Sequence, residues 1–186
     1  MDAQTQQLGL FEENEALTGA SFSKCKKYRY ALWRVWDKDM FGVMAAFIMF
    51  NPSVAGEIEN DPTVRRCMSF AKRWGYSGIY IVNLFAYVTS DPADLDTVKD
   101  PIGPINDATL NELKLKGNNV DVIFAWGAKP KYIKRMKEVN RMFPHAKCIR
   151  LTKDGYPEHP LFLPGYLSPI DFEWKIEIQT KNNFSL

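Results

Sequence analysis

Cysteine and histidine are scarce in this chain, and their scarcity limits the chemistry open to it. The 186 residues include three cysteines and two histidines. Cys25, Cys67 and Cys148 lie far apart and form no C-x-x-C pair, so neither a disulfide framework nor a zinc or iron–sulfur site is indicated. We therefore expect a protein without metal or cofactor that resides in a reducing cytoplasm.

Long apolar runs are also missing. No stretch approaches the ~18 apolar residues of a membrane-spanning helix, and residues 1–27 lack the apolar centre of a signal peptide. We therefore expect no membrane contact. The net charge of +2 does not by itself identify a nucleic-acid-binding protein, and the sequence leaves the oligomeric state open.

The length and composition fit one globular domain, with 46% hydrophobic and 25% charged residues. Residues 1–23 carry few large apolar side chains and no clean periodicity, which predicts a flexible N-terminal arm. Residues 24–186 are then expected to form a single α/β domain.

Apolar runs alternate with helical patterns along this domain. Buried strands are predicted at residues 43–50, 79–87, 120–126 and 148–151, and helices at 62–74, 106–116 and 131–143. The first helix has Asp61 as its expected N-cap, Pro62 at its first position and Gly75 just past its end. The alternation predicts a three-layer α/β fold with a short, mainly parallel four-stranded sheet, to which residues 28–36 add an N-terminal strand or hairpin.

Polar side chains gather where the predicted strands end. Ligand sites in such sheets form beyond the carboxyl ends of the strands. The segments expected there are Asn51 with Pro52 and Ser53, Asn83, Trp126, and the loop 152–164 that contains Lys153 and His159. The sequence therefore predicts one site at this edge, with these residues as candidates for substrate binding or catalysis.

Each candidate has a functional and a structural interpretation. Asn51 is placed to orient a water or a substrate edge, or only to stabilise a turn. Asn83 interrupts an apolar strand, and its amide must pair with the backbone or with a ligand, because an unpaired buried amide costs ~1–3 kcal/mol. His159 lies between Pro157 and Pro160, and this rigid loop favours an electrostatic or acid–base role.

The start of the first helix is a candidate anion site. Its free N–H groups favour a phosphate, and Arg65 and Arg66 lie one turn in. Asp61 is the carboxylate nearest to Asn51 in the sequence and is a candidate for activating water. The alternative is an ordinary capped helix with solvated arginines. Phe50, Phe85 and Trp126 offer a base-stacking platform or simple core packing.

Several of these motifs, in this order, resemble a family found in bacteria and phages, the domain-of-unknown-function family numbered 1643. The resemblance extends over residues 28–165. It rests on Asn51-Pro52-Ser53, Asp61 to Cys67, Trp74-Gly75-Tyr76, Val82 to Ala86, Trp126-Gly127, and Leu151 to Gly155 with His159-Pro160-Leu161.

A more distant resemblance is to the uracil-DNA glycosylase superfamily, α/β proteins with a short parallel sheet. It implies that Asn51 positions a water and that His159 steadies the departing base. It also implies that Asn83 reads the base edge and that Phe50 or Phe85 stacks on the base. The chain departs from the superfamily at Met49, where glycine is common, and at Leu161-Phe162, where Ser-Pro is usual.

The first functional hypothesis is a DNA N-glycosylase-like protein that cleaves or recognises a base, including a modified one. The alternative is a non-catalytic protein that binds a nucleotide or nucleic acid on the same fold. Hydrolysis by Ser53 with His159 is a third hypothesis, but Ser53 lacks the G-x-S-x-G elbow.

Overall fold

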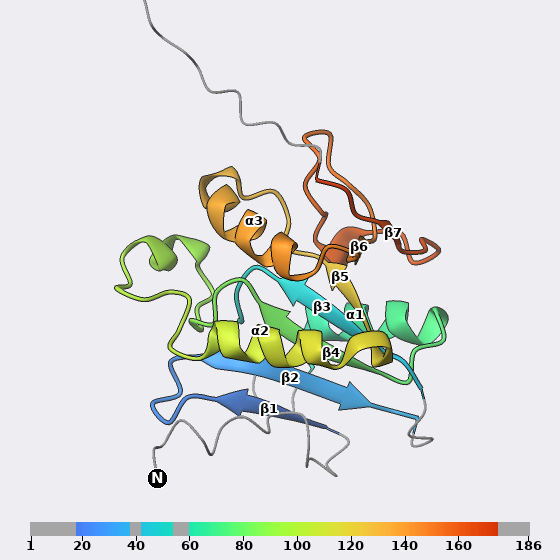
Figure 1. Ribbon diagram of the computed structural model, residues 1–186, viewed down its shortest axis with the longest axis horizontal. Coiled ribbons are helices and arrows are strands. Elements are labelled where there is room, and N and C mark those ends of the chain that lie inside the picture. Colours follow the sequence, from blue (N-terminus) through green and yellow to red (C-terminus); the bar gives the residue numbers. More distant parts are fainter. Residues whose placement is uncertain (1–17, 38–41, 54–59, 175–186) are drawn as a thin grey trace, which may run out of the picture.

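The computed structural model describes residues 18–37, 42–53 and 60–174, and within them one mixed sheet of seven strands (Figure 1). The strands are β1 (Thr18–Phe22), β2 (Arg29–Val35), β3 (Met44–Met49), β4 (Gly78–Asn83), β5 (Val120–Phe124), β6 (Lys147–Cys148) and β7 (Ile170–Asp171). The α-helices are α1 (Pro62–Arg73), α2 (Asn106–Leu115) and α3 (Ile133–Met142). Short 3-10 segments lie at Pro92–Asp96, Gly117–Asn119, Pro130–Tyr132 and Pro160–Phe162.

The strand order is β1-β2-β4-β3-β5-β6-β7. The four predicted strands are present, and β4, β3, β5 and β6 run parallel to one another. The prediction of a four-stranded sheet is wrong in size, because β2 and β1 extend it antiparallel beyond β4, and β7 pairs antiparallel with β6. The α/β class and the parallel core are confirmed.

The first strand corrects the predicted boundary of the N-terminal arm. Residues 18–22 form β1, the antiparallel partner of β2, so these two strands make up the expected hairpin. The arm was predicted to extend to residue 23 because residues 1–23 carry few large apolar side chains and no clean periodicity. The pairing of β1 depends on β2 rather than on any periodicity of its own.

The sheet is covered on both faces, as the three-layer prediction requires (Figure 1). On one face α1 buries Val64, Cys67, Phe70 and Ala71 in a cluster with Phe47 and Ile81. On the other face α2 and α3 bury Leu110, Leu113, Met136 and Val139 in a cluster with Val82 and Phe124. None of the helices in the described part of the chain is long and apolar enough to cross a membrane.

Helix α1 begins and ends at the residues that its sequence signals predict. The Asp61 side chain accepts a hydrogen bond of 2.7 Å from the Val64 N–H, and Pro62 occupies the first turn. Gly75 follows the C-cap residue Trp74 with φ of +82°, a conformation that favours glycine. The N-terminus of α1 is thereby fixed at the carboxyl ends of β3 and β4.

Candidate functional site

A polar cavity of about 130 Å³ lies beyond the carboxyl ends of β3 and β4, beside the start of α1. Its polar lining includes three of the residues predicted to meet there, Asn51, Asn83 and His159. Asn51 follows β3, Asn83 ends β4, and His159 lies in the loop after β6. Parallel strands therefore bring side chains from distant parts of the chain to one edge of the sheet.

A second, wide cavity of about 370 Å³ adjoins the polar cavity and shares Met49, Asn51 and His159 with it. Its remaining lining includes two predicted aromatic residues, Phe50 and Trp126, and one residue without a predicted role, Lys129. The structure thus distributes the predicted residues over two neighbouring cavities rather than one. Asn51 and His159 belong to both.

The Asn83 amide is the least satisfied polar group of the polar cavity. Asn83 is 1% exposed, and within the part of the chain that the structure describes neither its amide nitrogen nor its amide oxygen has a hydrogen-bond partner. Its backbone carbonyl, in contrast, accepts a hydrogen bond of 3.0 Å from the Asn106 side chain. The strand is therefore satisfied while the side chain is not, which opposes the interpretation of Asn83 as a backbone-paired core amide.

Asn51 has a fixed orientation. Its amide nitrogen donates to the carbonyls of Thr89 (2.9 Å) and Pro52 (3.1 Å). Both donor hydrogens are therefore engaged, and this pattern assigns the amide oxygen as the remaining functional atom. An amide oxygen in this cavity can accept a hydrogen bond from a water or from a ligand.

Asp61 combines the cap of α1 with a negative charge in the polar cavity. One carboxylate oxygen accepts from Val64 N–H, and the other accepts from the Ser53 hydroxyl at 2.8 Å. A water bound to Asp61 would share an oxygen with one of these two donors. The Asp61 charge also acts on His159: burial lowers the pKa of this imidazole, and the smaller effect of Asp61 raises it.

His159 is held as a neutral hydrogen-bond donor. Burial lowers the pKa of its imidazole, Asp61 opposes this shift, and the charge of Lys129 adds to it. Its Nδ1 atom accepts the Leu161 N–H at 3.4 Å, at the start of a 3-10 turn. An Nδ1 acceptor places the proton of the neutral ring on Nε2, so Nε2 is the donating atom.

Arg29 lines the polar cavity and was missed as a site residue by the sequence analysis. It is 3% exposed, and although burial lowers its pKa to about 10, the side chain remains charged at neutral pH. The pairing of Ser21 with Ala31 and of Phe22 with Arg29 leaves Tyr30 as an extra residue in β2. Such a bulge reverses the alternation of side chains, which would otherwise place Arg29 on the opposite face with Ala31.

Five predicted residues line neither cavity: Pro52, Arg65, Arg66, Lys153 and Phe85. Pro52 is buried, and its carbonyl accepts a hydrogen bond from the Asn51 amide. Arg65 is exposed and donates to the Asn60 carbonyl, whereas Arg66 donates to the Leu163 carbonyl and lies 4.7 Å from the Phe70 ring centroid. Lys153 is exposed in a turn. Phe85 is buried, with its ring centroid 5.4 Å from that of Phe50 in an edge-to-face contact. The side chains of these five residues therefore do not line the site.

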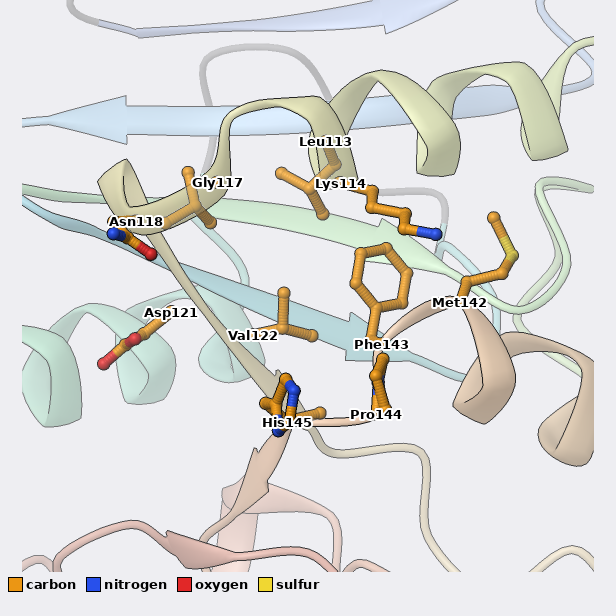
Figure 2. A pocket seen from close by; sticks show the side chains of 12 residues that line it. Leu113, Lys114, Gly117, Asn118, Asp121, Val122, Met142, Phe143, Pro144 and His145 are labelled. Atoms are coloured by element: carbon orange, nitrogen blue, oxygen red, sulfur yellow. The ribbon is translucent and has the colours of Figure 1, made fainter.

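A third cavity, of about 350 Å³, lies at the opposite edge of the sheet, between the ends of α2 and α3 (Figure 2). Leu113, Val122 and Phe143 supply much of its apolar lining. Its carboxylate, Asp121, already binds the Tyr76 hydroxyl (2.6 Å) and Lys147 (2.7 Å). Over residues 18–37, 42–53 and 60–174, no group of three or more His, Cys, Asp and Glu side chains is arranged to hold a metal ion.

Comparisons with known proteins give a family but no activity. A family model described as "Protein of unknown function (DUF1643)" matches residues 29–161. No curated protein and no solved structure matches the chain. The resemblance to the uracil-DNA glycosylase superfamily therefore rests on the sequence motifs alone.

Proposed function

Because the chain belongs to the DUF1643 family, whose description assigns no activity, we propose its function from the geometry of the site: a DNA N-glycosylase-like protein that acts on a base. The observation that carries the proposal is the unpaired, buried amide of Asn83 in a cavity that also contains Asn51 and His159. An amide presents one acceptor and two donors. It complements the edge of a base that has been turned out of a duplex, and such a base would supply the missing partners.

The other two residues suit the chemistry of glycosidic cleavage. A water held by the Asn51 amide oxygen attacks the sugar carbon, and the bond from that carbon to the base nitrogen breaks with its electron pair on the base. The Nε2–H of His159 donates to the departing base and stabilises its negative charge. One such donor is typically worth ~2.7–4 kcal/mol. The proton lost by the water passes to solvent or to the released base.

The Asp61 carboxylate of the polar cavity suits the charge that develops on the sugar when the glycosidic bond breaks towards the base. Positive charge develops on the sugar in glycosidic cleavage, and the Asp61 carboxylate lines the cavity on the α1 side. The Ser53 hydroxyl and the Val64 N–H hold this carboxylate in place. Its charge therefore needs no reorganisation during the reaction.

The aromatic residues and the fold add weaker support. Phe50 and Trp126 line the wide cavity, where they suit contact with a neighbouring nucleotide. The parallel core is α/β with helices on both faces, which is compatible with the glycosylase-like fold that the motifs imply.

A second candidate function is non-catalytic binding of a nucleotide or nucleic acid. The observation that favours it is the engagement of both Asp61 oxygens. Among the described residues that line the polar cavity, no other carboxylate is available to act as a base. The small volume of the polar cavity, about 130 Å³, also favours recognition of a small group over enclosure of a large one.

The test is incubation with duplexes that contain uracil, hypoxanthine or a bulky modified pyrimidine, followed by alkali and detection of strand breaks. The proposal expects breaks at one of these bases, and their loss in Asn51→Ala and His159→Gln. Lys153→Ala is the matched control, since Lys153 is exposed and outside both cavities. Binding without abasic sites would support the second candidate, and neither binding nor cleavage would refute both.

A further inference from the structure

We propose that the wide cavity is a phosphate subsite in which the Lys129 ammonium and the Trp126 indole N–H bind a phosphate group of the nucleotide. The inference rests on the proposed function, because it extends the same site from the base to the rest of the nucleotide. It also transfers phosphate binding from the predicted arginines, Arg65 and Arg66, to Lys129, which had no predicted role.

Lys129 differs from two other lysines, Lys131 and Lys147, in its pairing. Lys131 forms an ion pair of 2.5 Å with Asp96, and Lys147 one of 2.7 Å with Asp121. Among the described residues, no carboxylate lies within ion-pair distance of Lys129. Its ammonium lies 5.3 Å from the Phe50 ring centroid, a cation–π contact that holds it at the wall of the wide cavity.

Trp126 supplies a second, independent donor. It is 1% exposed and lines the wide cavity, and its indole nitrogen has no hydrogen-bond partner among residues 18–37, 42–53 and 60–174. Its ring is fixed by packing, with the Phe124 ring centroid at 4.3 Å and that of Phe172 at 6.4 Å. The packed indole offers an N–H donor in a fixed orientation, and a phosphate oxygen in the wide cavity would supply its missing acceptor.

The chemistry of these groups selects the ligand class. An ammonium and an indole N–H are donors only, and the neutral His159 at the same cavity donates from Nε2. A phosphate offers acceptors only, together with a negative charge for Lys129. The apolar walls from Met49 and Phe50 fit the sugar or base attached to it.

The backbone holds Lys129 in this position. Gly127 turns the chain after β5 with φ of +77°, and its N–H donates to the Pro157 carbonyl at 2.9 Å. This bond joins the strand end to the loop that contains His159. Pro130 then starts a 3-10 turn, for which Lys129 is the residue at the N-terminal boundary. The lysine stem therefore starts from a rigid turn beside the proposed base site.

The proposed subsite is also coupled to His159. The charge of Lys129 contributes to the lowered pKa of His159, and Asp61 opposes it. A phosphate bound to Lys129 would offset that positive charge and raise the pKa of His159. If Lys129 had only a structural role and bound no phosphate, added phosphate would not change the pKa of His159 through it.

The experiment measures affinities of wild type, Lys129→Gln and the control Lys131→Gln for inorganic phosphate and for matched 2′-deoxynucleosides and their 5′-monophosphates by calorimetry. In wild type and the control we expect monophosphates to bind about tenfold more tightly than nucleosides, which corresponds to about 1.4 kcal/mol. Lys129→Gln should remove this preference and the binding of inorganic phosphate. Competition by a short single-stranded oligonucleotide distinguishes a backbone phosphate from that of a free nucleotide.

A second readout is the NMR titration of His159, with His145→Gln used to assign the two imidazoles. Phosphate should raise the pKa of His159 in the wild type but not in Lys129→Gln. Nucleoside binding without a phosphate preference, or phosphate binding unchanged in Lys129→Gln, would overturn the subsite and leave the proposed function standing. Lys129-dependent phosphate binding without any nucleoside binding would support the subsite and contradict the proposed function.

Discussion

Replacement of Asn83 by leucine should stabilise the folded protein while it removes ligand binding. The Asn83 amide is buried at 1% exposure and lacks a partner for both its nitrogen and its oxygen. Leaving a buried polar group unsatisfied costs about 1–3 kcal/mol, whereas an apolar side chain of the same shape avoids that cost. We therefore expect Asn83→Leu to raise the free energy of unfolding by about 1–3 kcal/mol.

Urea denaturation is the primary assay, because a shift of the midpoint at constant m-value reports stability alone. The same gain should raise Tm by about 2–4 °C for each kcal/mol in a chain of this size. Asn106→Leu is the matched control. The Asn106 amide donates to the carbonyls of Asn83 (3.0 Å) and Leu84 (3.2 Å), so its loss should destabilise by about 1–3 kcal/mol or more.

The opposite outcome for Asn83→Leu would refute this reasoning. If Asn83→Leu lowered the free energy of unfolding by more than about 1 kcal/mol, the Asn83 amide would have to be hydrogen-bonded in the free protein. It would then contribute to the stability of the fold as Asn106 does. The argument that a ligand supplies its partners would then fail. Stability gained together with binding lost is the combination expected of a site that evolution has kept for recognition.

Three further predictions concern the charges and the backbone of the site. Asp61→Ala should lower the free energy of unfolding by about 0.5–2 kcal/mol, because the α1 cap is lost. Asn is also a good cap, so Asp61→Asn should leave stability nearly unchanged, but it should lower the pKa of His159 further, as measured by NMR titration. An unshifted His159 pKa in Asp61→Asn would contradict the Asp61–His159 interaction. The folded-state pKa of His159 lies below its ordinary value of 6.5, so its neutral form contributes stability that is present above pH 6.5 and lost as pH falls through the folded-state pKa. His159→Gln should therefore reduce the difference in unfolding free energy between about pH 7.5 and about pH 5. An identical difference in wild type and variant would show that His159 does not cause the pH dependence of stability. Gly127→Ala should destabilise the protein by about 1 kcal/mol in thermal unfolding, because φ at this position is +77°. Steric contact is not the cause, since the new Cβ would lie at an ordinary 3.8 Å from the His159 Cβ. An unchanged stability would contradict the left-handed conformation of Gly127.

The sequence predicted the elements whose signals are local. Asp61, Pro62 and Gly75 mark the ends of α1 through capping chemistry that acts within a few residues. The apolar runs that became β3, β4 and β5 are buried on both faces, and their hydrophobic character alone identifies them. Their parallel pairing then places Asn51 and Asn83 at one edge of the sheet, because the carboxyl ends of parallel strands all lie at the same edge.

The parts that the sequence could not predict depend on contacts between distant segments. The orientation of Arg29 depends on a bulge in β2, which is visible only in its pairing with β1. Lys131 pairs with Asp96 because of where a distant loop lies, and this pairing could not be read from the sequence. The same holds for Lys129, which has no ion pair with any described carboxylate. A signal for Arg29 was nevertheless present, because a charged residue lies between Tyr28 and Tyr30 in a strand whose one other charged residue is Arg34.

The strand order has a consequence for synthesis on the ribosome. The edge of β2 that faces away from β1 pairs with β4, and β4 begins at Gly78, well after β2 ends at Val35. At about 5–20 residues per second, the ribosome needs roughly 2–9 s to bring β4 out after β2. During this interval an apolar strand edge of the nascent chain has no native partner. A chaperone that binds such edges would therefore engage this protein early in translation and be released when β4 docks.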